Sequence, residues 1–299
     1  MKKQTFKTLH KNSKTGILYV MPMLAITIFF WFLPIIVAVF GSLTNYTGMN
    51  HPSFIGLENY KKIFADGLFY SSLKTTLIFV VLVVPGQTIL AFLTAAWIDR
   101  KGSTIASNFV RWAMFIPTLA STSVIAIVCR TLLNNPESPL NEILKIFGIQ
   151  GNLLLGSDVG ALGALIVIQI LMSSGYYMVI YLAAMVTIPR SYYEAARLEG
   201  ISTFTVYRKI TLPIVKPTTI MIIFLGVLSG IQTFDLVYVM TGGGPQTATY
   251  TIMLYLYMYA FKYSKVAMGM AISIVMCVFI GAIIFWQRKT ISAKENNLY

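Results

Sequence analysis

The chain has 299 residues, of which 57% are hydrophobic and only 11% are charged. Soluble domains carry about 25% charged residues, so this composition excludes a soluble protein and indicates one that crosses a membrane several times. The formal net charge of +13 would also suit a nucleic-acid-binding protein, but the basic residues lie between apolar runs, where membrane topology accounts for them.

Six apolar runs divide the chain, and each is long enough to cross a bilayer, which takes about 20 helical residues. A short basic tail at 1–14 precedes them. The sequence therefore predicts an all-α polytopic membrane protein with a transmembrane domain at 15–299. The predicted transmembrane helices cover 17–43, 75–98, 112–129, 160–188, 213–235 and 266–287.

Basic residues are distributed unevenly between the two sides that six spans define. If the N-terminus lies in the cytoplasm, 16 Lys and Arg residues fall on the cytoplasmic side and 7 on the outer side. Cytoplasmic segments of membrane proteins carry an excess of Lys and Arg. We therefore predict that both termini are cytoplasmic, and that the segment 189–213, between the fourth and fifth helices, lies on the same side.

The segment 189–213 is polar but strongly patterned. Pro189 and Ser191 suit the start of a helix, and Gly200 can end it. Ser202 can then cap a second short helix. From residue spacing alone, a purely structural pair of helices on the membrane surface explains the pattern equally well.

The same segment resembles the EAA loop of ABC importer permeases. Glu194-Ala195-Ala196 is followed after three residues by Gly200, and after nine more by Ile210 and then Leu212-Pro213. In that family the loop forms short cytoplasmic coupling helices, which dock in a cleft of the ATPase subunit. The resemblance implies that the residues that couple this chain to an ATPase are Glu194, Ala195, Ala196, Gly200, Ile210, Leu212 and Pro213.

Two segments on the predicted outer side carry a further resemblance. Residues 56–60 read GLENY, which is similar to a stretch that follows the first helix of ABC sugar permeases. Residues 234–245 read FDLVYVMTGGGP, which is similar to the FD…Y…TxGGP pattern of the maltose- and glycerol-phosphate-type permeases. The chain thus resembles a six-helix member of that binding-protein-dependent carbohydrate family.

The sequence offers no chemistry of its own for catalysis. It contains no G-x-x-x-x-G-K-[ST] phosphate-binding loop, and its two histidines, His10 and His51, lack the spacing of a metal site. We therefore expect no enzyme activity, no metal site and no cofactor in this chain. ATP and magnesium are expected on the partner ATPase that the resemblance implies.

The membrane core is predicted to be free of charge. Ion-driven transporters usually carry ionisable residues within the membrane, so their absence indicates that energy enters elsewhere. A phosphorylated solute would favour Arg or Lys in its pathway. A charge-free core therefore favours a neutral solute.

The fourth and fifth runs carry several polar side chains. Ser173 and Tyr177 are four residues apart and share one helix face, and hydroxyls and aromatic rings are natural partners of a sugar. Such residues also serve as hydrogen-bonding links between membrane helices, and either role fits. The resemblance to the maltose-type permease implies a solute pathway at Ser173, Ser174, Tyr177, Ser229, Gly230 and Thr233, to which polarity adds Gln232.

These observations predict the permease subunit of an ATP-driven importer for a sugar or oligosaccharide, in a prokaryotic cell membrane. The alternatives are an ABC permease for glycerol phosphate or another small polar solute, an ion-coupled secondary transporter, and a membrane scaffold without transport activity. The resemblance implies a second, similar permease, two ATPase subunits and an extracellular or periplasmic solute-binding protein as partners.

Overall fold

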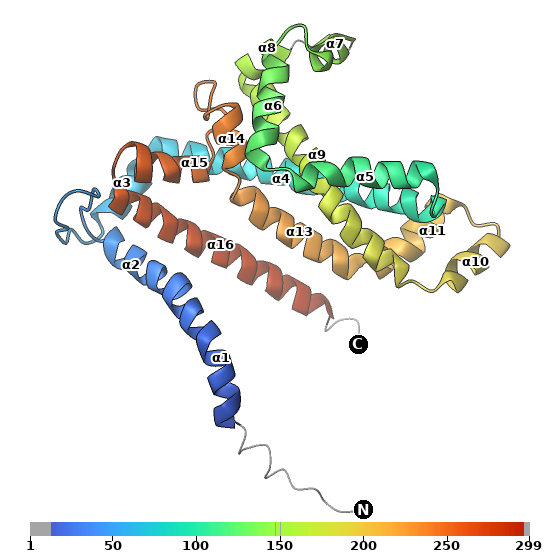
Figure 1. Ribbon diagram of the computed structural model, residues 1–299, viewed down its shortest axis with the longest axis horizontal. Helices are drawn as coiled ribbons and strands as arrows, with labels where there is room; N and C mark the ends of the chain where they lie inside the picture. Colours follow the sequence, from blue (N-terminus) through green and yellow to red (C-terminus); the bar gives the residue numbers. More distant parts are fainter. Residues whose placement is uncertain (1–12, 147, 150, 296–299) are drawn as a thin grey trace, which may run out of the picture. The chain divides into compact units, whose positions relative to one another are not determined.

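The computed structural model describes residues 13–146, 148–149 and 151–295, which form helices joined by turns and loops (Figure 1). The described residues contain no strand, only one isolated bridge between Thr44 and Phe54. This confirms the all-α class. The predicted basic tail at 1–14 lies almost wholly outside the described residues.

The described chain divides into two compact units. The first takes the described residues up to Ala65 together with Leu256–Gly281, and the second takes Asp66–Tyr255 together with the described residues from Ala282 on. The helices that begin in the first unit are α1 (Ser13–Thr27), α2 (Leu33–Ser42), α3 (Glu58–Ala65) and α16 (Val266–Glu295), with π-helical turns at Ile28–Phe32 and Met258–Lys262.

All other helices begin in the second unit. They are α4 (Gly67–Lys101), α5 (Ile105–Leu119), α6 (Thr122–Asn134), α7 (Pro139–Ile146), α8 (Gly151–Gly156), α9 (Asp158–Val186), α10 (Arg190–Leu198), α11 (Thr203–Val206), α12 (Leu212–Ile214), α13 (Lys216–Ile231), α14 (Asp235–Met240) and α15 (Ile252–Tyr257), with a π-helical turn at Tyr207–Thr211 (η3).

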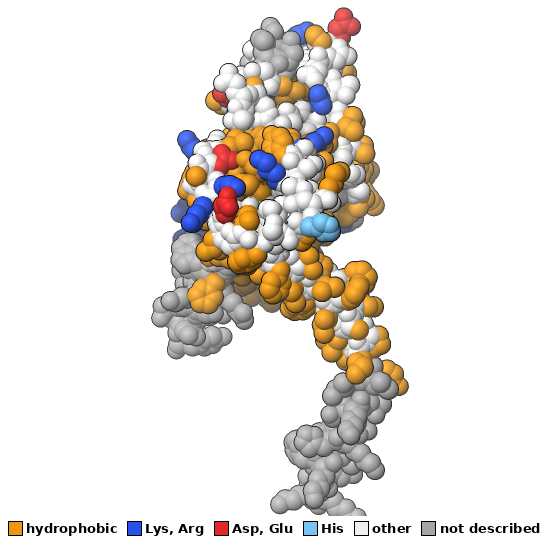
Figure 2. Space-filling view, turned by 90° about the vertical axis from the view of Figure 1, so that its left-hand side faces the viewer, with side chains coloured by type: hydrophobic (Ala, Val, Ile, Leu, Met, Phe, Trp, Pro, Cys, Tyr) orange, Lys and Arg blue, Asp and Glu red, His pale blue; other side chains and the backbone are white. Residues whose placement is uncertain are grey.

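Among the described residues, four helices are long and apolar enough to cross a membrane, or six if each of two bent helix pairs forms one span. The four are Tyr19–Ser42, Gly67–Lys101, Asp158–Val186 and Val266–Phe285, and the pairs are Ile105–Leu119 with Thr122–Asn134 and Thr203–Ile214 with Lys216–Ile231. Figure 2 shows that the helix running toward the N-terminal end has a largely hydrophobic surface. A lipid-facing helix needs such a surface.

The third predicted span differs from the structure. The run 112–129 is apolar enough for one helix, but the chain forms α5 and α6, which are bent by 104°. Ala120 and Ser121 between them have extended backbones, and Pro117 removes a backbone donor from the last turn of α5. Hydropathy reports only whether a run can lie in lipid, so it missed this break.

The GLENY stretch has a structural role in the first unit. The buried Asn59 amide donates hydrogen bonds to the carbonyl oxygens of Ser42 and Thr44, both at 2.8 Å. The Tyr60 hydroxyl lies 2.7 Å from Ser42 Oγ. These bonds satisfy carbonyl groups that the end of α2 leaves without helical partners, so α3 is held against the end of α2.

The core of the second unit is built by α4, α9 and α13, which pack on one another (Figure 1). Small side chains allow their close approach: Ala91 and Ala95 of α4 are fully buried, and Gly230 of α13 faces Val80. Close packing between small residues is the usual way in which membrane helices associate. The three helices position both parts of the site described next.

Candidate functional site

The segment between α9 and α13 forms the two short helices that the sequence predicts. Gly200 has a φ of +69°, and the backbone N–H of Ile201 donates to the carbonyl of Ala196 at 2.9 Å. This is the turn that commonly ends a helix at glycine. The Ser202 hydroxyl then accepts a hydrogen bond from the N–H of Thr205 at 3.4 Å and caps α11.

The predicted ATPase-coupling residues divide by exposure. Ala196 is buried and Ile210 is half-buried, so these two hold the segment on the rest of the chain. Leu198 and Phe204 are 91% and 75% exposed beside the predicted residues, and large exposed apolar side chains rimmed by polar ones mark interaction surfaces. The exposed predicted residues are Glu194, Ala195, Gly200, Leu212 and Pro213.

A pair of hydrogen bonds links this segment to the end of α4. The Tyr207 hydroxyl lies 3.0 Å from the Ala96 carbonyl oxygen and 3.1 Å from Asp99 Oδ2, and donates to both. Burial of the ring, followed by the nearby Asp99 carboxylate, raises the pKa of Tyr207 well above its ordinary value. The hydroxyl therefore stays protonated and acts as a donor.

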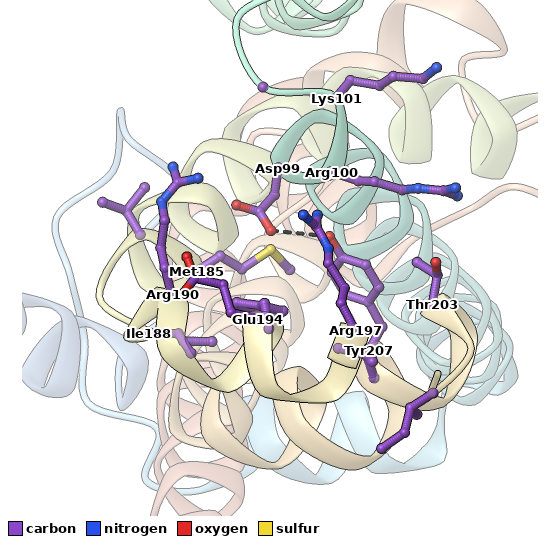
Figure 3. A pocket seen from close by; sticks show the side chains of 15 residues that line it. Asp99, Arg100, Lys101, Met185, Ile188, Arg190, Glu194, Arg197, Thr203 and Tyr207 are labelled. Carbon is purple, nitrogen blue, oxygen red and sulfur yellow. Dashed lines mark hydrogen bonds between the residues drawn. The ribbon is translucent and has the colours of Figure 1, made fainter. Parts of the chain in front are cut away.

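The Tyr207–Asp99 hydrogen bond lies in the wall of a cavity of about 340 Å³ between the end of α4 and α10–α11 (Figure 3). In the view of Figure 3, Arg190 and Arg197 reach up on either side of Asp99, whereas Arg100 and Lys101 extend away from it. The sequence alone did not connect Tyr207 with Asp99. No local pattern connects two residues that are 108 positions apart.

Two further cavities lie along α9 and α13, of about 500 and 380 Å³, and share Thr122, Gln169 and Ser229 in their walls. Five predicted pathway residues line them. Ser173 and Tyr177 line the larger cavity, Gln232 and Thr233 line the smaller one, and Ser229 lines both.

Two predicted pathway residues lie elsewhere. Ser174 is fully buried and donates to the carbonyl of Leu171 at 3.2 Å. Gly230 is buried against Val80, where a Cβ would already lie 3.0 Å from the valine side chain. Both positions serve helix packing in this structure, which is the alternative role that small and polar residues have in membranes.

The break between α5 and α6 supplies lining residues that the sequence did not reveal. Thr118, Ala120 and Thr122 flank the break and line the larger cavity. Gln169 of α9 lines both cavities. Thr118 belongs to α5 and Thr122 to α6, so both helices beside the bend contribute a hydroxyl group to the same cavity.

Gln87 of α4 lies behind the wall of the larger cavity. It is 2% exposed, and its Oε1 accepts a hydrogen bond from the Ser173 hydroxyl at 2.5 Å. Its Nε2 is buried and lies against Gly226 of α13, so Gln87 stands where α4, α9 and α13 meet.

Charge is nearly absent from the two cavities. Of the residues that line them, Asp235 is acidic and none is Lys or Arg. In the described part of the chain there is also no cluster of His, Cys, Asp and Glu that could hold a metal ion. Hydroxyls, amides and aromatic rings therefore dominate the lining, which suits hydrogen bonding to a neutral polar solute.

The chain matches a known protein family. The family model for "Binding-protein-dependent transport system inner membrane component" matches residues 87–292. The trehalose/maltose transport system permease protein of Thermococcus litoralis is 30% identical over 249 residues, which cover 83% of this chain and 84% of that protein. The multiple sugar-binding transport system permease protein of Streptococcus mutans is 27% identical over 271 residues, which cover 90% and 92%.

A solved structure has the same fold. A chain of a bacterial alginate ABC transporter, in complex with an alginate pentasaccharide-bound periplasmic protein, matches with a TM-score of 0.81. It is 20% identical in sequence, and the match covers 95% of this chain and 96% of that chain.

Proposed function

Because this chain belongs to the family of binding-protein-dependent transport system inner membrane components, we propose that it is the permease subunit of an ATP-driven importer for a sugar or oligosaccharide. Membership makes it a membrane component of a transport system rather than an enzyme. In this proposal it forms half of the translocation pathway, and a second, similar permease forms the other half.

The observation that carries the sugar proposal is the lining of the two cavities that share Ser229. Hydroxyl and amide groups there can exchange hydrogen bonds with sugar hydroxyls, and Tyr176 and Tyr177 can pack against sugar C–H faces. The relatives named above transport trehalose, maltose and other sugars, which supports the same class for this chain. The absence of Lys and Arg from the lining favours a neutral sugar over an anionic one.

We place the ATP-dependent step outside this chain. The exposed face of α10–α12, with Glu194, Gly200 and Leu212, is proposed to dock on one of two ATPase subunits, which would bind ATP and magnesium. This chain would then need no cofactor. A solute-binding protein would deliver the sugar from the outer side, as the family description implies.

The orientation follows from charge. We propose that both termini and the coupling segment 189–213 face the cytoplasm, since that arrangement puts most Lys and Arg inside. In a background without Cys129 and Cys277, Glu137→Cys should react with a membrane-impermeant maleimide in intact cells, and Glu199→Cys only after lysis. Both sites are exposed, so the reverse labelling pattern would contradict the orientation.

Uptake into proteoliposomes tests the function. Vesicles that hold the full complex, internal ATP and the cognate solute-binding protein should accumulate at least one of labelled maltose, trehalose and lactose. They should not accumulate glycerol 3-phosphate or an alginate trisaccharide. ATP-dependent uptake of glycerol 3-phosphate would instead support the alternative of a phosphate-ester permease, and uptake of none of these solutes would argue against sugar import.

The same vesicles test the pathway through Ser229→Leu. Ser229 is exposed and lines both cavities, so a leucine there should fill the path without disturbing the packed core, and uptake should fall sharply. Ser229→Ala, which removes only the hydroxyl, should have a smaller effect. Thr27→Leu, a matched change in a span that lines neither cavity, should transport normally, and normal uptake by Ser229→Leu would place the pathway elsewhere.

A further inference from the structure

The linkage between α4 and the coupling segment goes beyond simple packing. The Tyr207 hydroxyl connects η3 to the last turns of α4, where it has two acceptors. These are the Ala96 carbonyl and the Asp99 carboxylate. A hydroxyl that donates to a carboxylate forms a charge-assisted bond, which is stronger than a neutral one. The bonds fix where η3 lies relative to α4.

Within the coupling segment, α10 and η3 are also linked to each other. The Tyr193 hydroxyl of α10 lies 3.0 Å from Thr211 Oγ1 of η3, and the rings of Tyr193 and Tyr207 lie 6.4 Å apart. Thr211 is fully buried. A displacement of α10 is therefore passed to η3 and to Tyr207 rather than absorbed within the segment.

Near its middle, α4 reaches the wall of the larger of the two cavities. Gln87 lies 12 residues before Asp99 on the same helix, which corresponds to about 18 Å along the axis. Its side chain accepts from Ser173, which lines the larger cavity. One rigid helix thus bonds to the coupling segment at its end and to a cavity residue at its middle.

We propose that Tyr207 and Asp99 are positioning residues that transmit movement of the coupling segment to α4, and through Gln87 to the solute cavity. The inference rests on the proposed function, because it needs an ATPase that moves the segment. The physical link is two hydrogen-bonded contacts on a single continuous helix. Without the Tyr207 bonds, the segment can still dock on the ATPase, but its movement is no longer tied to α4.

Tyr207→Phe is the first test because it removes the hydroxyl and keeps the ring that packs beside Tyr193. We expect solute transported per ATP hydrolysed to fall, because hydrolysis continues while movement of the segment no longer reaches α4. The amount of ATPase that co-purifies with the permease should not change. Tyr19→Phe, which removes an exposed hydroxyl from the first span, should leave the ratio unchanged.

Variants of Asp99 separate transmission from general stability. Asp99→Ala leaves the Ala96 carbonyl as an acceptor for Tyr207, so its effect should be smaller than that of Tyr207→Phe. Asp99→Asn keeps an acceptor oxygen and should restore most of the ratio. The double variant Tyr207→Phe with Asp99→Ala should be no worse than Tyr207→Phe alone, because both changes break the same link.

The measurement uses the full complex in vesicles, with whichever neutral disaccharide the wild type imports, and counts labelled sugar against released phosphate. An unchanged ratio in both Tyr207→Phe and Asp99→Ala would overturn the inference while leaving the proposed function intact. Equal loss of ATPase activity and uptake, together with a lower melting temperature, would also overturn it, since that result shows only structural damage. A wild type that imports no sugar would instead refute the proposed function.

Discussion

Gly200→Leu should abolish solute uptake while the permease remains folded in the membrane. Gly200 has a φ of +69°, and apart from its chain neighbours no atom of the described residues lies within 4 Å of the place where a Cβ would stand. A leucine therefore meets no resistance from this chain apart from the backbone cost of a left-handed residue, roughly 1–2 kcal/mol. Any larger effect must come from a partner that approaches the turn closely.

A graded series separates those two causes. Gly200→Ala carries the backbone cost with little added bulk, so it should bind the ATPase only slightly less well. Gly200→Leu adds bulk toward the partner and should lose ATPase co-purification. Gly148→Leu is a matched control, because Gly148 has a φ of +70° and the same open surroundings outside the coupling segment.

Glu194→Ala should be milder than Gly200→Leu. Glu194 is exposed, and an exposed ion pair contributes only about 0–1 kcal/mol, which salt screens, whereas steric exclusion cannot be screened. If Gly200→Leu keeps both the ATPase and full uptake, then the segment from Glu194 to Pro213 does not couple this permease to its ATPase.

Gly175→Leu should prevent the permease from folding. Gly175 lies in α9 where α5 crosses it, and a Cβ there would overlap the carbonyl oxygen of Met114 and crowd the Cα of Phe115. The obstacle is backbone rather than a flexible side chain, so the two helices would have to move apart. Even Gly175→Ala should lose about 1–3 kcal/mol, as overpacked cores do.

The measurement is the yield of monodisperse permease in detergent and its melting temperature. Gly163→Leu on the same helix is the matched control, because in the described part of the chain no atom beyond its own helix backbone and chain neighbours lies within 4 Å of a Cβ at that position. Gly175→Leu should give little or no monodisperse protein, and Gly163→Leu should give close to the wild-type yield. A stable, active Gly175→Leu permease would mean that α5 and α9 do not pack as the structure has them.

The coupling segment shows which features local sequence can predict. Its two helices, the glycine that separates them and the serine cap all follow from interactions within a few residues, and the structure contains each of them. The membrane class follows equally well from hydropathy, because transfer into lipid depends on composition over about 20 residues. The division of exposure within the segment was not predictable, since it depends on how the segment lies on α4.

The two cavities along α9 and α13 show what local sequence cannot predict. Five of the seven predicted pathway residues line them, but Ser174 and Gly230 face helix interfaces instead. Helical spacing groups residues on a face, but it does not say which face meets a cavity and which meets another helix. Helix rotation and crossing geometry decide that, and these arise from packing among α4, α9 and α13.

The sequence by itself determined that the chain is an all-α membrane protein, and its local motifs indicated the coupling segment and the family resemblance. Only the tertiary structure decided that the third apolar run breaks between α5 and α6, that Gln87 lies behind Ser173, and that Tyr207 bonds to Asp99. The physical reason is the separation along the chain over which each interaction acts. Hydropathy and helix capping act between residues close in the chain, whereas Tyr207 and Asp99 meet only after separate helices have packed.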